Sequence, residues 1–330
     1  MAIAMNKKGI FFTFAAVALS IIILLSFNTY NEYRLKDSME ATEIRIDTMN
    51  SFVRDIEDSL GDAIFIVGFR SLLSLEDYMM KYDRFMGQED SPNLAAGFKD
   101  LFLYGRITTG VNTKSMGLMD NNTFFNWTER MNVQANKTGI ELKFTINDAA
   151  ISQSEPWKVD VSVNLKVEAK DKKGTASWVI NKVLAKKINI TGFADPLYLV
   201  NNKKDSDIGV VNNTIRITPV NPAESESKLN THLINSYYIG HTDAPSYLMR
   251  FENNLGSSSY GIESLVNSQK RIDAGLSALD RSAVDYIYYG TQATTNCEVK
   301  NPSYSWFKLD KLPNPNHLDF YNAQCKVGGG

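Results

Sequence analysis

An uncharged run of eighteen residues, from Ile10 to Phe27, constrains this chain more than any other feature of its sequence. A helix of this length rises about 27 Å, close to the hydrocarbon thickness of a bilayer, about 30 Å. Lys7 and Lys8 precede the run, and the first charge after it is Glu32. The positive-inside rule then places the N-terminus in the cytoplasm. We therefore expect a transmembrane helix over 10–27, with everything after about Asn28 outside the cell.

The residues around Gly9 bear on how this segment is processed. No small-residue cleavage site follows Phe27, so we expect the apolar segment to stay attached. Lys7-Lys8-Gly9-Ile10-Phe11 resembles a class III (prepilin) signal, in which a membrane peptidase cleaves after the glycine. Phe14, the fifth residue counted from Ile10, stands where bacterial pilins carry glutamate. The chain is therefore more similar to archaeal type IV pilin-like surface proteins, over roughly its first sixty residues. A signal anchor that is never cleaved is the alternative.

The resemblance implies a cut between Gly9 and Ile10 by a prepilin peptidase, followed by self-association through the apolar helix. In either interpretation the lipid bilayer is a partner: the helix stays anchored in it, or the subunit is extracted from it during assembly. The side chains expected to contact lipid or neighbouring helices are Ile10, Phe11, Phe12, Phe14, Val17, Leu19, Ile21, Ile22, Ile23, Leu24 and Leu25.

A stalk is expected beyond the membrane, over residues 28–90. Apolar or small residues recur there in alternating steps of four and three, a 3.5-residue repeat with charges on the other faces. The repeat comprises Leu35, Met39, Thr42, Ile46, Met49, Val53, Ile56 and Leu60. Neither proline nor glycine occurs between Ile10 and Leu60, so one continuous helix is predicted from the membrane into the ectodomain. After Gly61 apolar residues occupy most sides, which predicts a buried segment, and residues 87–92 are expected to end the helix.

The clearest β signal lies in the predicted head, residues 91–222. From Trp157 to Val167 apolar residues alternate with polar ones, which is typical of a strand with one buried face. Residues 171–174 read as a turn and 176–180 as the returning strand. With 140–146 before and 187–191 after, an antiparallel sheet of about four strands is expected. Short helices are expected over 95–136 and a second strand pair over 208–218.

The last third, residues 223–330, mixes Ser/Asn-rich loops with aromatic clusters and is expected to form a C-terminal module. Cys297 and Cys325 are the two cysteines, and an oxidising compartment favours a disulfide between them. The predicted fold class is α+β: a long N-terminal helix, transmembrane and then stalk, packed on an antiparallel sheet head with a C-terminal α/β extension. The expected segments are 1–9, 10–27, 28–90, 91–222 and 223–330.

Composition and motifs argue against several kinds of chemistry. A net charge of −2 and 43% hydrophobic content are ordinary globular values, so nucleic acid is a poor partner. The three histidines, His232, His241 and His317, show no metal-ligand spacing, and neither a metal nor another cofactor is expected. His241, Asp243 and Ser246 suggest a hydrolase triad, but neighbours in one short loop cannot easily adopt that geometry. The chain is therefore predicted not to be an enzyme.

Five sequons are candidate glycosylation sites outside the cell, at Asn121, Asn126, Asn136, Asn189 and Asn212. Their number is close to chance for a chain this rich in Asn, Ser and Thr. Three of them crowd into a region predicted to be a loop.

Three functions remain open from sequence. The favoured one is a pilin-like structural subunit, held at the cell membrane with an extracellular head or packed into a surface filament. The second is a monomeric signal-anchored receptor or adhesin that binds a glycan or protein partner. The third is an unrecognised ectoenzyme, which a cluster of polar residues with perturbed ionisation would favour.

Overall fold

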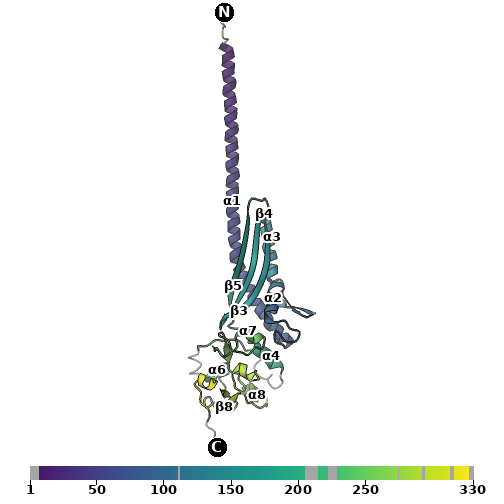
Figure 1. Ribbon diagram of the computed structural model, residues 1–330, viewed down its shortest axis with the longest axis vertical. Coiled ribbons are helices and arrows are strands. Elements are labelled where there is room, and N and C mark those ends of the chain that lie inside the picture. The colour runs from purple at the N-terminus through teal and green to yellow at the C-terminus, as the bar shows by residue number, and fades with distance from the viewer. Residues whose placement is uncertain are drawn as a thin grey trace.

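The computed structural model describes residues 7–110, 112–204, 215–221, 229–273, 275–291, 294–312 and 316–326; within these ranges, side chains at 7–17, 27–35, 37–38, 202–204, 270 and 312 are not described. One long helix projects from an elongated head, and the C-terminus lies at the end of the head farthest from it (Figure 1). The fold is α+β with antiparallel sheets, as expected.

Helix α1 runs without interruption from Lys7 to Tyr82, 76 residues or about 114 Å at 1.5 Å per residue. The predicted continuity is confirmed, but the helix ends before residues 87–92. Asp83 takes a left-handed φ of 51°, which stops it. Along the stalk repeat, Met49, Ile56 and Leu60 are buried whereas Met39 is 71% exposed. The helix therefore packs against the head along its C-terminal half, and its N-terminal half projects beyond the head (Figure 1).

The segment after Gly61 is less buried than its composition predicts. Ala63, Ile64, Val67, Leu72 and Leu75 pack into the core. A second set on the outer side of the helix remains exposed: Phe65, Ile66 and Phe69. The predicted burial is therefore confirmed on the face of α1 that packs against the head and not on its opposite face.

A small helical layer follows α1. Asn93 caps α2 by accepting a hydrogen bond from the backbone N–H of Ala96, and Thr123 with Asn126 forms a capping box at the start of α3. The elements here are α2 (Leu94–Tyr104), β1 (Arg106–Thr109), β2 (Asn112–Ser115), the 3₁₀ turn η1 (Gly117–Met119) and α3 (Phe124–Lys137). The expected short helices over 95–136 are thus present, together with one short hairpin.

The central sheet has three antiparallel strands in the order β3-β4-β5, with α1 along one side in Figure 1. These are β3 (Ile140–Glu155), β4 (Lys158–Asp171) and β5 (Ser177–Asn189). The alternation predicted for β4 is confirmed: its alternate apolar residues Val159, Val161, Val163, Leu165 and Val167 are buried. The expected fourth strand does not exist, because 176–180 and 187–191 contribute to one long strand, β5.

Close approach fixes α1 against the sheet. A Cβ at Gly68 would lie 3.0 Å from Val161 and 3.1 Å from Ile188, so glycine lets the helix backbone reach the strands. Trp178 on β5 donates its indole N–H to the Asn50 side chain at 3.1 Å. These contacts place the sheet beside the C-terminal half of α1.

The C-terminal part is built from short elements around two small sheets, β6-β7 and β8-β9. Its elements are α4 (Pro196–Lys204), α6 (Leu229–Asn235), β6 (Tyr238–Gly240), α7 (Tyr247–Phe251), β7 (Ile262–Ser264), α8 (Gln269–Asp273), α9 (Asp285–Tyr288), β8 (Thr295–Glu298), β9 (Lys308–Leu312) and α10 (His317–Phe320). Buried apolar residues from Met49 to Tyr321 form one continuous cluster. The head and the C-terminal module therefore share a core.

The strand pair expected over 208–218 falls largely on 205–214, outside the described residues. Of its remainder, Arg216 forms an isolated bridge with Ala194, and nearby Pro219 forms one with Tyr238. The boundary expected at Asn221-Pro222 adjoins 222–228, also outside the described part, and stays a prediction.

Candidate functional site

The first candidate site is the N-terminal part of α1 that projects beyond the head, which we call the projecting part of α1. Of the eleven apolar side chains expected to face lipid or other helices, six are described, and all are exposed: Leu19, Ile21, Ile22, Ile23, Leu24 and Leu25. The other five, Ile10, Phe11, Phe12, Phe14 and Val17, lie outside the described side chains. Across the described residues, no helix meets the combined length and apolarity expected of a membrane span.

The proposed processing site is only partly described. Gly9 and Ile10 lie near the start of α1, whose first residue is Lys7. Their side chains and the whole of residues 1–6 are outside the described part of the chain. Cleavage after Gly9 stays a prediction.

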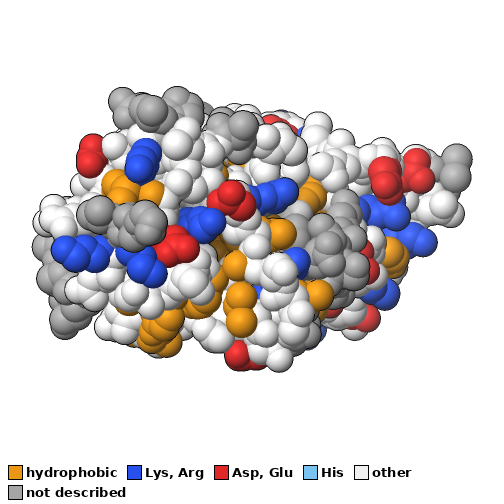
Figure 2. All heavy atoms as spheres, turned by 90° about the horizontal axis from the view of Figure 1, so that it is seen from below, with side chains coloured by type: hydrophobic (Ala, Val, Ile, Leu, Met, Phe, Trp, Pro, Cys, Tyr) orange, Lys and Arg blue, Asp and Glu red, His pale blue; other side chains and the backbone are white. Residues whose placement is uncertain are grey.

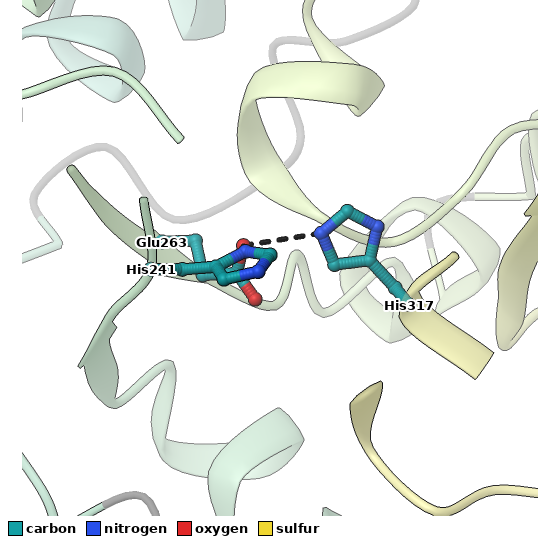
Figure 3. A group of neighbouring side chains, drawn as sticks. All are labelled: His241, Glu263 and His317. Carbon is teal, nitrogen blue, oxygen red and sulfur yellow. Dashed lines mark hydrogen bonds and ion pairs between the residues drawn. The ribbon is translucent and has the colours of Figure 1, made fainter. Parts of the chain in front are cut away.

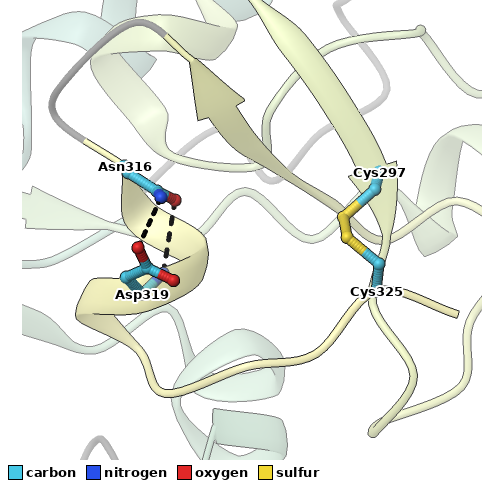
Figure 4. Close-up of a disulfide and its surroundings, with 4 residues drawn as sticks. All are labelled: Cys297, Asn316, Asp319 and Cys325. Atoms are coloured by element: carbon cyan, nitrogen blue, oxygen red, sulfur yellow. Dashed lines mark hydrogen bonds between the residues drawn. A yellow bond between two sulfur atoms is a disulfide. The ribbon is translucent and has the colours of Figure 1, made fainter.

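The predicted disulfide between Cys297 and Cys325 is confirmed (Figure 4), and it closes a separation of 28 residues. Cys297 lies on β8, and Cys325 follows α10 and forms a bridge with Val299. Asn316 caps α10 by accepting from the backbone N–H of Asp319 (Figure 4). The bond thus fastens the chain just after α10 to the β8-β9 sheet.

The sequence predicted that three of the sequons lie in one loop, and the structure does not place them so. Asn126 and Asn136 lie on α3, and Asn126 uses its side-chain oxygen in the capping box. Asn121 lies in the turn before α3, and Asn189 ends β5. Both of these and Asn136 are exposed. Asn212 is outside the described residues.

The second candidate site is a buried group of polar side chains in the C-terminal module, centred on His241, Glu263 and His317 (Figure 3). The Nδ1 atom of His241 lies 2.7 Å from Oε2 of Glu263, and Nε2 of His317 lies 3.2 Å from the same oxygen. The side chains of Glu263 and His317 are fully buried, and that of His241 is 12% exposed. We call these three residues the histidine–glutamate cluster.

Short local structures bring the three residues together. Glu263 is the central residue of β7, and antiparallel pairing sets it opposite Ile239 on β6, two residues before His241. A Cβ on Gly261 would collide with the carbonyl oxygens of His241 and Ala244, so only glycine permits this turn to close on β7. His317 opens α10, whose position is held by the disulfide that follows it.

Each member of the histidine–glutamate cluster has a second polar partner. His317 Nδ1 lies 2.9 Å from Asp310, which also accepts a hydrogen bond from Ser282. The hydroxyl of Tyr321 donates to Glu263 Oε1 at 2.7 Å. On the outer side, His241 Nε2 lies 3.7 Å from Asp243. The ring of His317 is therefore oriented by its hydrogen bond to Asp310, whereas His241 has a longer ion-pair contact with Asp243. The other nitrogen of each ring faces Glu263.

Burial and charge shift the ionisation of this group. Desolvation disfavours the charged imidazole of His317, but Glu263 and Asp310 outweigh it and raise the pKa to about 10. Desolvation likewise raises the pKa of Glu263, yet His317 and His241 lower it well below its usual range. By contrast, burial lowers the pKa of His232 to about 4. His232 packs edge-on against the ring of Tyr321, so all three histidines of the chain lie around this one region.

No protein-family model, curated protein or solved structure matches this chain significantly.

A second buried network lies on the other side of β7. Because side chains alternate along a strand, Ser264 points away from the histidine–glutamate cluster and donates to Asp285 at 2.9 Å. Arg250 is fully buried between Asp195 and Asp285, 2.6 and 2.8 Å from their carboxylates. Tyr238 also donates to Asp195, at 2.7 Å. This network joins α7, α9 and the turn before α4 and has the character of a structural ion pair.

Sequence reasoning missed the histidine–glutamate cluster, because its members are 22 and 54 residues apart and each occupies a different element. The short-range triad considered from sequence does not form. Ser246 serves as the N-cap of α7, accepting from the backbone N–H of Met249 at 3.5 Å. The spacing of the histidines carried no signal that could have revealed the cluster.

Proposed function

We propose that this chain is a non-enzymatic, pilin-like cell-surface subunit that is anchored or assembled through residues 10–27. The projecting part of α1 carries the proposal. Its described apolar residues, Leu19 and those from Ile21 to Leu25, are 46–68% exposed. A cluster of exposed apolar side chains of this kind marks contact with a membrane or with other protein. The resemblance of residues 7–11 to a prepilin signal supports the same conclusion.

The energetics of this surface favour a covering partner. Fully burying one large apolar side chain is worth about 1.5–3 kcal/mol, so the six described ones represent on the order of 10 kcal/mol. Insertion of the helix into a bilayer provides this burial free energy without any protein partner. A helix that leaves the bilayer for a filament must therefore recover the same free energy through close packing against neighbouring helices.

A second apolar area favours assembly over a simple tether. Phe65, Ile66 and Phe69 are 42%, 52% and 37% exposed on the part of α1 that lies along the head. Phe69 stacks edge-on against Phe193 at 5.0 Å between ring centroids, which holds this area in place. Because it lies beyond the segment expected in the bilayer, lipid would not cover it, whereas a neighbouring subunit could.

The burial of the histidine–glutamate cluster supports a non-enzymatic role. The cluster of perturbed polar residues that would favour an ectoenzyme is present, but Glu263 and His317 have fully buried side chains that a substrate cannot touch.

Figure 2 shows the C-terminal end of the molecule, where charged side chains of both signs are interspersed with apolar ones. That face does not single out a binding partner for a receptor or adhesin.

The decisive experiment is intact mass with N-terminal sequencing of the protein from native membranes and from sheared cell-surface material. A mature chain that begins at Ile10 and is recovered in a sheared, high-molecular-weight fraction is expected. The variant Gly9→Val should block this maturation, and Lys8→Arg, which keeps the basic charge, should not. A chain that keeps its first nine residues and occurs only as a membrane-bound monomer would contradict the proposal and favour the signal-anchored receptor or adhesin.

A further inference from the structure

We propose that His241, Glu263 and His317 form a binding site for one divalent metal ion, with zinc best suited to two imidazole nitrogens and a carboxylate. One candidate ligand atom from each of the three residues lies within 4.8 Å of the other two. The nitrogens that face the Glu263 carboxylate are His241 Nδ1 and His317 Nε2. The three side chains point toward one another from three separate segments, the turn after β6, strand β7 and helix α10 (Figure 3). This site is independent of the pilin-like function proposed above.

The spacing suits a small transition-metal ion. Zinc–nitrogen and zinc–oxygen bonds of about 2.0–2.2 Å in tetrahedral geometry place neighbouring ligand atoms about 3.3–3.5 Å apart. His317 Nε2 and Glu263 Oε2 are 3.2 Å apart, already near that value. His241 Nδ1 and the same oxygen are 2.7 Å apart and need to separate by less than about 1 Å. His241 is the one partly exposed member and can make that adjustment.

The surroundings of the three ligands follow the pattern that metal sites use to orient them. In such sites the nitrogen of an imidazole that does not bind metal donates to a carboxylate, which fixes the ring and its tautomer. His317 Nδ1 does so to Asp310 at 2.9 Å, and His241 Nε2 faces Asp243 at 3.7 Å. Glu263 is steadied by the hydroxyl of Tyr321 at 2.7 Å. Each nitrogen left over faces the centre of the cluster.

Charge also favours a cation here. Glu263 and Asp310 are both fully buried, and the half-exposed Asp243 adds a third carboxylate at the edge. Buried carboxylates require compensation by positive charge, which the protonated imidazole of His317 supplies in the absence of metal. A divalent ion would displace the proton on Nε2 and supply that charge at the point where the ligands converge. The Tyr286 hydroxyl lies 3.2 Å from His317 Nε2, so a further oxygen adjoins the candidate ligand atoms.

The bound ion would cross-link the turn after β6, strand β7 and helix α10. These segments are short, and α10 is otherwise held by the disulfide at Cys325. A structural metal would therefore act as a second fastening of the C-terminal module, consistent with the nearly complete burial of the site.

The test is a zinc titration of the full-length chain in detergent, after stripping with a chelator, followed by competition with a chromophoric chelator and by thermal unfolding. One equivalent of zinc per chain and a rise in Tm of at least about 5 °C are expected. His241→Asn is the main variant, because its partly exposed side chain can be changed with least damage to folding, and it should weaken zinc binding more than about 100-fold. Glu263→Gln gives a second variant with the same expected loss.

The matched control is His232→Leu. Both ring nitrogens of His232 lack hydrogen-bond partners among the described residues, so this change removes a buried histidine of the same module without removing a ligand. Zinc stoichiometry and affinity should then be unchanged. Folded wild-type protein that takes up less than one equivalent of zinc, or a folded His241→Asn variant that binds as tightly as wild type, would overturn the proposal.

Discussion

Arg45 of α1 and Asp171 at the end of β4 form an ion pair across 126 residues of sequence, with Nε and Nη2 3.2 and 2.8 Å from the same carboxylate oxygen. The Arg45 guanidinium also donates to the carbonyl oxygens of Thr138 and Gly139, before β3. The Asp171 side chain is completely buried. One residue therefore fastens the helix to both strands of the β3-β4 pair at the point where α1 leaves the head.

The substitution Arg45→Met should loosen the end of the sheet from α1. The change keeps the aliphatic stem but leaves Asp171 buried without its cation. Hydrogen exchange should accelerate at 138–142 and 171–177 and remain unchanged in the C-terminal module. Lys182→Met, which removes the exposed pair with Glu57, is the control and should have little effect. Equal protection in both variants would contradict this assignment.

Arg250 should be among the least replaceable residues of the C-terminal module. Arg250→Met leaves Asp195 and Asp285 buried without a counter-charge, which costs about 3–5 kcal/mol of unfolding free energy. Chemical denaturation measures the loss. Adding Asp195→Asn and Asp285→Asn to the same variant should recover part of it, since the unpaired charges are then gone. A single variant as stable as wild type would show that the pair is not structural.

Stability should fall as pH rises between about 4.5 and 8 because of Glu76. Burial raises the pKa of this α1 carboxyl to about 8, against hydrogen bonds from Tyr247 and from the Ala194 backbone N–H. The folded state therefore holds a proton that the unfolded state has released above pH about 4.5, and this contribution is fully lost once pH passes about 8. The difference in unfolding free energy between wild type and Glu76→Gln, measured across this range, should change by a few kcal/mol. A constant difference would show that Glu76 ionises normally.

The disulfide should contribute substantially to the C-terminal module. Opening the 28-residue separation between Cys297 and Cys325 restores chain entropy to the unfolded state, worth about 3–4 kcal/mol. The double variant Cys297→Ser/Cys325→Ser should unfold at lower denaturant concentration and be cut more readily near α10. Reduction of the wild type should have the same effect. Unchanged stability in both would indicate that neighbouring packing holds the segment alone.

A charge introduced on the projecting part of α1 should separate assembly from folding. Ile22 is 63% exposed and lies in the segment proposed to meet lipid or other subunits. Ile22→Asp should abolish the anchored or high-molecular-weight form, measured by fractionation of cells and shearings, while the Tm of the head stays unchanged. Glu40→Gln, an exposed polar position on the same helix, should alter neither. Normal fractionation of Ile22→Asp would remove the role proposed for this surface.

Local pattern determined the parts of this protein that depend on neighbours in sequence. The unbroken helix over the stalk, the alternation along β4 and the turn at 171–174, where Gly174 has a φ of 77°, all follow from short-range periodicity and backbone preference. The disulfide was equally predictable from the sequence, because each of the two cysteines has only one possible partner in the chain. The strand count failed since residues between two apparent strands continued in extended conformation as β5.

Only the tertiary structure decided which distant residues meet. It left Phe65, Ile66 and Phe69 uncovered, although their composition predicted burial, because a helix is covered only where other elements reach it. It gathered His241, Glu263 and His317 from three short elements whose separations follow no repeat. Periodicity records which face of an element is apolar, whereas the packing of elements against one another determines what that face and its polar residues finally contact.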